Sequence, residues 1–161
     1  PALDPSAEAK RMFARLGLRG IARLIMHAQR DMARSRLGLS AHKIPIVGPP
    51  GSVAFFDLPD AYAGYSALAP DGFVNEVCAR IVLRASMYRP IEHAKAVDCP
   101  VLLQVCERDE LVSPETAVAT AQVLGPRAEV KRYPIGHFDI YQGAHFEVAV
   151  RDQLAFFEKH L

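Results

Sequence analysis

The sequence predicts an α/β fold: parallel strands with crossover helices in the C-terminal third, preceded by a mainly helical segment. After Pro100 the patterns follow the order strand, loop, helix, strand, loop, helix, which is typical of parallel strands joined by right-handed crossovers. Residues 1–97 instead combine helical spacing with a stretch rich in proline and glycine. The chain has 161 residues, of which 50% are hydrophobic and 23% charged. This is the size and composition of one ordinary globular protein.

The first segment, residues 6–36, has the pattern of a helix in two pieces. Ser6 follows Pro5 and is a suitable N-cap. Gly17 and Gly20 weaken the middle, each by roughly 1 kcal/mol relative to alanine. One side of the predicted helix carries Phe13, Leu16, Gly20, Leu24 and Ala28 at helical spacing. A separate charged stripe is formed by Arg11, Arg15, Arg19 and Arg23.

The middle of the chain changes character twice. Residues 44–72 are dense in proline and glycine, which predicts an ordered but irregular covering segment that packs its aromatic side chains. Residues 73–86 return to helical spacing and predict a helix, and residues 88–99 predict a linker.

The C-terminal third contains two predicted strands, each followed by a helix. Residues 101–107, VLLQVCE, form an apolar run typical of a strand buried on both faces. A helix is expected from Pro114 to Leu124, with Ser113 as N-cap and Gly125 ending it. Residues 129–134 predict a shorter strand, and residues 144–160 predict the closing helix.

Asp109 and His137 are the strongest candidates for chemistry. Each lies just past the carboxyl end of a predicted strand, and these ends form the functional edge of an open parallel sheet. A carboxylate that accepts the Nδ1 proton of a histidine fixes the tautomer, so that the other ring nitrogen can take a proton from a nucleophile. The alternative is that Asp109 caps a turn and His137 is an ordinary loop residue.

The stretches CPVLLQVCERDELVSPE, YPIGHFDIY and QLAFFEKHL resemble the C-terminal part of the α/β-hydrolase fold. They look most like bacterial hydrolases near the serine aminopeptidase and dipeptidyl-peptidase-like members. The resemblance is specific over residues 98–161 and implies that Asp109 is the triad acid and His137 the triad histidine. Residues 1–97 are similar in kind to the helical cap that covers the active site in this superfamily.

The resemblance implies a serine hydrolase that acts on a small ester or amide substrate and needs no cofactor. The upstream strands, the oxyanion-hole loop and the G-x-S-x-G segment have no counterpart before residue 98. We therefore expect a fragment whose partner is the missing N-terminal half of the hydrolase core, with self-association as another possibility, and expect the chain alone to be inactive. Related dehalogenases, epoxide hydrolases and transferases use the same histidine with other nucleophiles, and a non-catalytic cap-like interaction module is a further alternative.

Ser66 offers a nucleophile within the chain itself. Gly64-Tyr65-Ser66 approaches the G-x-S-x-G pattern, and Ser66, Asp109 and His137 follow the chain order of α/β-hydrolase triads. However, Leu68 replaces the last glycine, and no strand pattern precedes the serine. We interpret GYSAL as a turn in the cap and retain a small self-contained hydrolase as the minor alternative.

Charge and cysteine content favour a cytoplasmic protein with neither a nucleic-acid nor a membrane partner. The net charge is +1, and no apolar run reaches the roughly 18 residues of a membrane span. Residues 1–43 hold nine Lys/Arg against three Asp/Glu, which indicates either a binding surface or a face that meets an acidic neighbour. The Arg stripe is interpreted as a solvated helix face, with an anionic surface as the alternative.

Three other chemistries find little support in the sequence. The three cysteines have neither a C-x-x-C nor a zinc spacing, and Cys106 is expected in the core. His137, Asp139 and His145 fit no metal pattern, so we expect no metal site. No glycine-rich nucleotide motif is present.

Overall fold

The computed structural model describes residues 3–161 and divides the chain into two compact units. The N-terminal unit is Pro5–Tyr88, and the C-terminal unit combines Arg89–Leu161 with residues 3–4. Residues 89–97, assigned to the cap from the sequence, therefore pack with the C-terminal unit. Whether residues 1–97 act as a cap stays a prediction.

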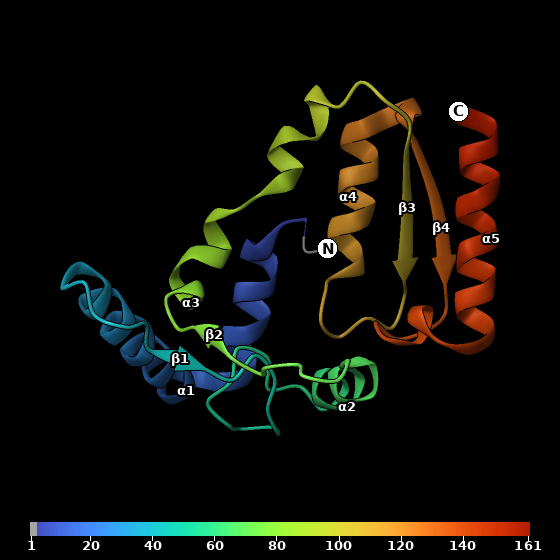
Figure 1. Cartoon of the computed structure of the whole chain (residues 1–161). Helices are drawn as coiled ribbons and strands as arrows, with labels where there is room; N and C mark the ends of the chain where they lie inside the picture. The colour runs from blue at the N-terminus through green and yellow to red at the C-terminus, as the bar shows by residue number, and fades with distance from the viewer. Residues whose placement is uncertain (1–2) are drawn as a thin grey trace. The chain divides into compact units, whose positions relative to one another are not determined.

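The N-terminal unit is built on α1, Pro5–Arg36 (Figure 1). Gly17 has a φ of 62° and a ψ of −178°, which interrupts the helix where the sequence predicted two pieces. The helix begins at Pro5, so Ser6 lies inside it and is not the N-cap that we expected. Beyond the break, Leu24 packs with Ile44 and Ala79 in the core of this unit.

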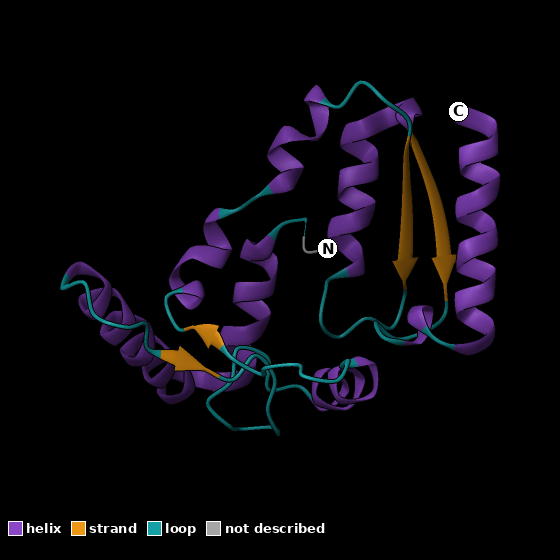
Figure 2. Ribbon diagram, in the orientation of Figure 1, coloured by secondary structure: helices purple, strands orange, loops and turns teal. Residues whose placement is uncertain are grey.

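A short antiparallel pair follows, in which β1, Lys43–Ile44, contacts β2, Val77–Cys78 (Figure 2). The helix predicted over residues 73–86 is wrong in its first half. Asn75 pairs with the backbone of Val47, accepting from its N–H at 2.9 Å and donating to its carbonyl at 2.8 Å. This pairing keeps the segment around Asn75 in an extended conformation. Only α3, Ile81–Arg84, and the 3-10 turn Ala85–Met87 are helical in this region.

The segment predicted to be irregular contains a helix, α2, Pro59–Leu68. Proline suits the first turn of a helix because the N–H that it lacks has no partner there. Because Gly64 and Ser66 belong to this helix, the prediction of a turn at GYSAL is wrong. No non-glycine residue among the described ones has a positive φ.

An ion pair with a buried carboxylate joins α1 to the segment after β2. The side chain of Asp31 is fully buried, and its Oδ2 accepts from Arg80 Nε at 2.6 Å. The same carboxylate accepts from the backbone N–H groups of His42 and Arg80 at 2.7 and 3.0 Å. These hydrogen bonds, led by that from the Arg80 side chain, lower the pKa of Asp31 to about 2.

The C-terminal unit contains the two parallel strands that the sequence predicted, each within a residue of the expected bounds. They are β3 (Val101–Cys106) and β4 (Ala128–Tyr133). Their register places Val101 opposite Ala128 and Cys106 opposite Tyr133. The helices α4 (Pro114–Leu124) and α5 (Gly143–His160) lie on either side of the strands (Figure 1). The segment expected as a linker contains the 3-10 helix Pro90–Ala96.

A partly buried polar network fixes α5 to the strands. The Tyr133 hydroxyl donates to Asp152 Oδ2 at 2.7 Å and accepts from Gln104 Nε2 at 2.9 Å. Gln104 also donates to the backbone carbonyl of Ala149. Burial raises the pKa of Tyr133 to about 12, so the phenol stays a hydrogen-bond donor at neutral pH. The network ties both strands to one helix.

Candidate catalytic site

Asp109 lies in the loop that leaves the carboxyl end of β3. The ladder continues past the strand, because the N–H of Glu107 donates to the Tyr133 carbonyl at 2.8 Å and that of Arg108 to the Ile135 carbonyl at 3.0 Å. The chain then turns, and Asp109 Oδ1 accepts from the N–H groups of Leu111 and Val112 at 2.8 and 2.7 Å. One carboxylate oxygen is thus used to hold its own loop, and the other is left for a different partner.

His137 lies in the corresponding loop after β4. Ile135, which is buried, anchors the start of this loop. The N–H of Gly136 donates to Asp139 Oδ2 at 2.8 Å and closes the turn that carries the histidine. The imidazole ring meets the rings of Phe138 and Tyr141 edge to face, with centroids 4.8 and 6.1 Å away. The backbone and these rings together restrict the orientation of the imidazole.

The two candidates are in direct contact, as the sequence predicted for neighbouring parallel strands. His137 Nδ1 lies 2.7 Å from Asp109 Oδ2. The aspartate side chain is 10% exposed and the histidine side chain 20% exposed. A carboxylate can only accept, so a hydrogen bond between them puts the proton on Nδ1. Nε2, which has no hydrogen-bond partner among residues 3–161, is then the basic nitrogen.

Ser66 does not have the surroundings of an elbow nucleophile. It lies in the last turns of α2, is exposed, and its Oγ donates to the carbonyl of Tyr62 at 2.7 Å. This is the back-bonding of a helical serine to the residue four positions earlier. An elbow serine instead follows a buried strand on a sharp turn. Ser66 belongs to the N-terminal unit, whereas Asp109 and His137 belong to the C-terminal unit.

Cys106, the reactive side chain nearest in sequence to Asp109, lies in the core. It is buried at the end of β3 with Tyr133, Ile135 and Ala149. Burial raises the pKa of the Cys106 thiol to about 11. The thiolate is the nucleophilic form, and burial disfavours it at neutral pH.

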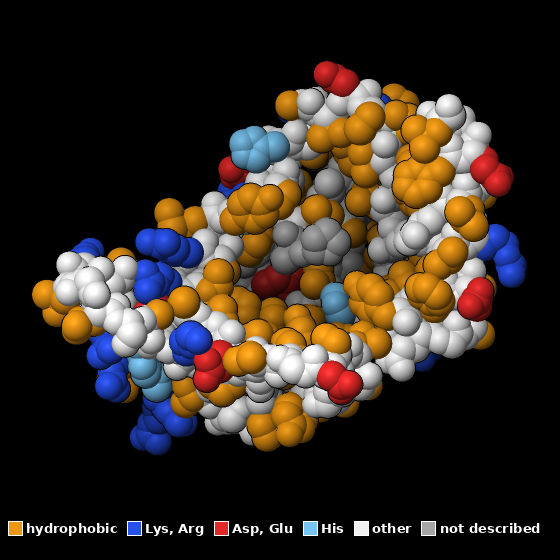
Figure 3. Space-filling model, in the orientation of Figure 1, with side chains coloured by type: hydrophobic (Ala, Val, Ile, Leu, Met, Phe, Trp, Pro, Cys, Tyr) orange, Lys and Arg blue, Asp and Glu red, His pale blue; other side chains and the backbone are white. Residues whose placement is uncertain are grey.

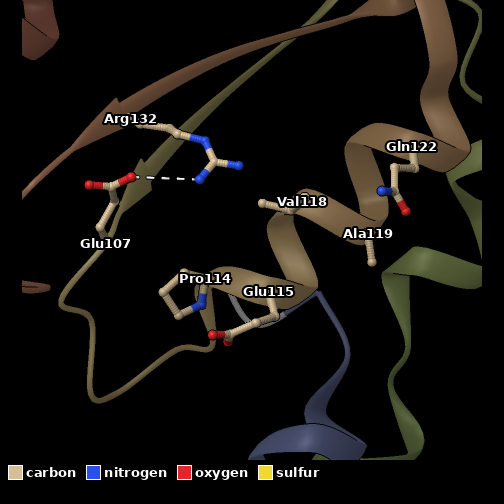
Figure 4. Close-up of a pocket in the computed structure, with 7 residues that line it drawn as sticks. All are labelled: Glu107, Pro114, Glu115, Val118, Ala119, Gln122 and Arg132. Atoms are coloured by element: carbon tan, nitrogen blue, oxygen red, sulfur yellow. Dashed lines mark ion pairs between the residues drawn. The ribbon is translucent and has the colours of Figure 1, made fainter.

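Two further features of the described residues bear on function. No group of three or more His, Cys, Asp or Glu side chains in residues 3–161 is arranged to hold a metal ion. An open pocket of about 450 Å³ lies between α4 and an ion pair of Arg132 with Glu107, whose atoms Nη1 and Oε1 are 3.6 Å apart (Figure 4). Neither Asp109 nor His137 lines this pocket.

Comparison with other sequences gives relatives longer than this chain. No protein-family model matches. The quorum-quenching protein AidA of Acinetobacter baumannii (strain MDR-ZJ06) is 39% identical over 134 residues, which are 82% of this chain and 44% of AidA. An uncharacterized 31.7 kDa protein from the traX-finO intergenic region of Escherichia coli is 35% identical over 82 residues, 50% of this chain and 29% of that protein. The chain thus spans less than half the length of these relatives.

Comparison with solved structures defines the fold. The α/β hydrolase GrgF from Penicillium sp. sh18 superimposes with a TM-score of 0.70 at 17% identity, covering 91% of this chain and 52% of GrgF. DcsB, solved in complex with its substrate analogue, gives a TM-score of 0.66 at 21% identity, with 86% of this chain and 50% of DcsB covered. The chain has the C-terminal part of an α/β-hydrolase fold, as the sequence predicted. The nearer resemblance to aminopeptidase-like members stays a prediction.

A helix that crosses a bilayer must be both long and apolar. Within residues 3–161, no helix could cross a membrane.

Sequence reasoning missed the groups that hold the two candidates in place. The N–H groups of Leu111 and Val112 bind Asp109, and Asp139 closes the loop of His137. An aspartate two or three residues before its N–H partners is a recognisable turn signal. The ring contact of Tyr141 with His137 depends on the 3-10 turn Asp139–Tyr141, which the sequence does not indicate.

Proposed function

We propose that this chain supplies the acid and the base of a serine hydrolase that cleaves an ester or amide bond. The observation that carries the proposal is the 2.7 Å contact between His137 Nδ1 and Asp109 Oδ2, on loops that follow neighbouring parallel strands. The hydrolase fold supports it, because its triads combine a serine with a histidine and an acid.

In the proposed reaction, His137 Nε2 takes the proton of a serine hydroxyl as that oxygen attacks the substrate carbonyl. The imidazolium then gives this proton to the leaving group, and the second half-reaction uses water in place of the serine. Asp109 orients the ring and stabilises its positive charge through Oδ2. The N–H groups of Leu111 and Val112 keep the carboxylate in position.

The nucleophilic serine is proposed to lie in an upstream half of the hydrolase core, which is the partner of this chain. Two observations support such a partner. Each of β3 and β4 has one neighbouring strand among the described residues, and an unpaired strand edge favours pairing with another strand. A stripe along α5 exposes large apolar side chains at helical spacing, namely Phe146, Leu154, Phe157 and Leu161.

We further propose that residues 1–97 cover the substrate, as caps do, and that the substrate has an apolar acyl or alkyl group. The aromatic side chains of the N-terminal unit support this proposal, since Phe56 stacks on Tyr65 and Tyr65 on Phe73. The name of AidA, a quorum-quenching protein, favours a small signalling molecule as the substrate. A cytoplasmic location remains part of the proposal.

Replacing Asp109 with Asn tests the proposed role of the acid in the complete enzyme. We expect kcat to fall by about ten-thousandfold, because an amide can donate to Nδ1 and stabilise the wrong tautomer. Substrate binding should change little, because Asp109 contacts the histidine and its own loop. The measurement is steady-state hydrolysis of a chromogenic ester, with separate determination of kcat and KM.

The matched control is Asp139→Asn, which keeps an oxygen that can accept from the N–H of Gly136. We expect the kcat of this variant to stay within about tenfold of the parent, because the side-chain oxygen of Asn can still accept the hydrogen bond from Gly136. If Asp109→Asn lowered kcat no more than this control, Asp109 would not be the triad acid.

A further inference from the structure

The helix α1 and the turn after it carry positive charge with little counter-charge. Between Glu8 and Asp57 the sequence holds nine Lys and Arg residues but one acidic residue, Asp31. That carboxylate is fully buried and paired with Arg80. In contrast to Arg11 and Arg15, which pair with acidic side chains, the side chains of four arginines form no hydrogen bond or ion pair with the described residues: Arg19, Arg23, Arg30 and Arg36.

The part of α1 after Gly17 exposes large apolar side chains next to these arginines. Leu18 is 75% exposed and Met26 is 66% exposed, and Ile25 is also exposed. At about 100° per residue, these three side chains fall in one sector about 100° wide. The unpaired Arg19, Arg23 and Arg30 fall in the adjoining sector, about 40° wide.

The buried side of the same helix is different. Leu24, Ala28 and Asp31 are buried in the N-terminal unit and lie on the side of the helix away from both sectors. The outer face of α1 is thus an apolar strip with arginines along one edge. In the space-filling view, Lys and Arg side chains gather around hydrophobic ones in the region of α1 and the turn that follows it (Figure 3).

This combination fits an anionic bilayer surface better than the other anionic partners. The phosphates of a nucleic acid would pair with the arginines, but they provide no apolar surface for Leu18 and Met26. A bilayer accepts both groups, because apolar side chains enter the acyl boundary while arginines reach up to the headgroup phosphates. A solvated helix face, which the sequence alone favoured, does not explain the exposed apolar strip.

We propose that the membrane-binding face of α1, defined as Leu18, Arg19, Arg23, Ile25, Met26 and Arg30, lies on the surface of a bilayer that contains anionic phospholipid. The helix would rest in the plane of the interface, in agreement with the absence of a spanning helix from residues 3–161. The proposal is independent of the hydrolase chemistry, since none of these residues belongs to the candidate site.

The test is co-sedimentation of the chain with vesicles of phosphatidylcholine, with and without an equimolar share of phosphatidylglycerol. We expect binding to the anionic vesicles to be at least about tenfold stronger, since each basic residue near an anionic surface adds favourable energy. High salt should weaken this binding, because it screens the arginines.

Two variants identify the face. The triple variant Arg19→Gln, Arg23→Gln, Arg30→Gln should lower binding to anionic vesicles by about tenfold or more. The double variant Leu18→Gln, Met26→Gln should also weaken it, because it removes the apolar insertion.

The matched control is Arg84→Gln, Lys95→Gln, Arg151→Gln, which removes the same charge from exposed positions outside the face and should change binding by less than about twofold. Circular dichroism establishes that each variant is folded.

Several results would overturn the proposal. Equal binding to neutral and anionic vesicles, or binding to neither, would rule out an anionic bilayer as the partner. An equal loss in the control triple variant would mean that net charge alone attracts the chain. Binding to polyglutamate but not to vesicles would identify an acidic protein as the partner instead.

Discussion

Replacing His137 with Ala in the complete enzyme is expected to remove nearly all hydrolysis. His137 is the proposed base and acid in both half-reactions, so its loss should lower kcat by about ten-thousandfold or more. The fold should survive, because the ring is partly exposed and its one hydrogen bond is to Asp109, whose carboxylate is also held by its own loop. The measurement is single-turnover hydrolysis of an activated ester, with unfolding of the variant followed in parallel.

His145 provides the matched control. It is an exposed histidine in the first turn of α5, and its replacement by Ala should leave kcat within about twofold, as for most surface substitutions. If the His137→Ala variant kept more than about a tenth of the parent activity, a general-base role worth several powers of ten would be excluded.

Replacing Asp31 with Asn is expected to have the largest effect on stability. The amide cannot pair with the Arg80 guanidinium, and its NH₂ group would face donors that the carboxylate now satisfies. Removing one partner of a buried pair costs about 3 kcal/mol or more in free energy of unfolding. Urea titration followed by circular dichroism measures this loss.

The pH dependence of stability distinguishes loss of the Asp31–Arg80 ion pair from a change in packing at the same site. The pKa of Asp31 is lowered to about 2 in the folded chain, whereas an unfolded aspartate titrates near about 3.9. The ionised carboxylate therefore contributes its stability above about pH 4, and this contribution is lost as the pH falls toward about 2. In the Asp31→Asn variant, the fall in stability across this window should be smaller than in the parent.

The control for Asp31 is Glu76→Gln, which breaks the ion pair of Glu76 with Lys43. Both of these side chains are about half exposed, so we expect a loss below about 1 kcal/mol. Equal losses from the Asp31 and Glu76 variants would show that the buried pair does not hold α1 to the segment after β2.

The sequence was most informative where local pattern and topology agree. The apolar run before Asp109 and the helix from Pro114 to Leu124 were predicted almost to the residue. The contact between Asp109 and His137 followed from strand order alone, because neighbouring parallel strands end at the same edge.

Sequence reasoning failed where distant residues decide the structure. Asn75 binds Val47 and keeps its own segment out of a helix, although the apolar spacing there is helical. Asp31 and Arg80 are 49 residues apart, and nothing in either local pattern indicates that they pair. The density of helix breakers in the proline-rich segment did not predict α2. Pro59 nevertheless fits this helix, because it occupies the first turn, where proline is tolerated.

The central claim is that this chain supplies a histidine and an acid to a serine that lies in an upstream half of the enzyme. Labelling with a fluorophosphonate probe tests it directly, with the modified residue located by mass spectrometry in the chain alone and in the chain combined with the proposed upstream half. The account predicts no label on this chain, and label on a serine of the upstream segment that is lost in the His137→Ala variant. Label on Ser66 of the isolated chain, lost when His137 is replaced, would contradict the account and identify a small complete hydrolase.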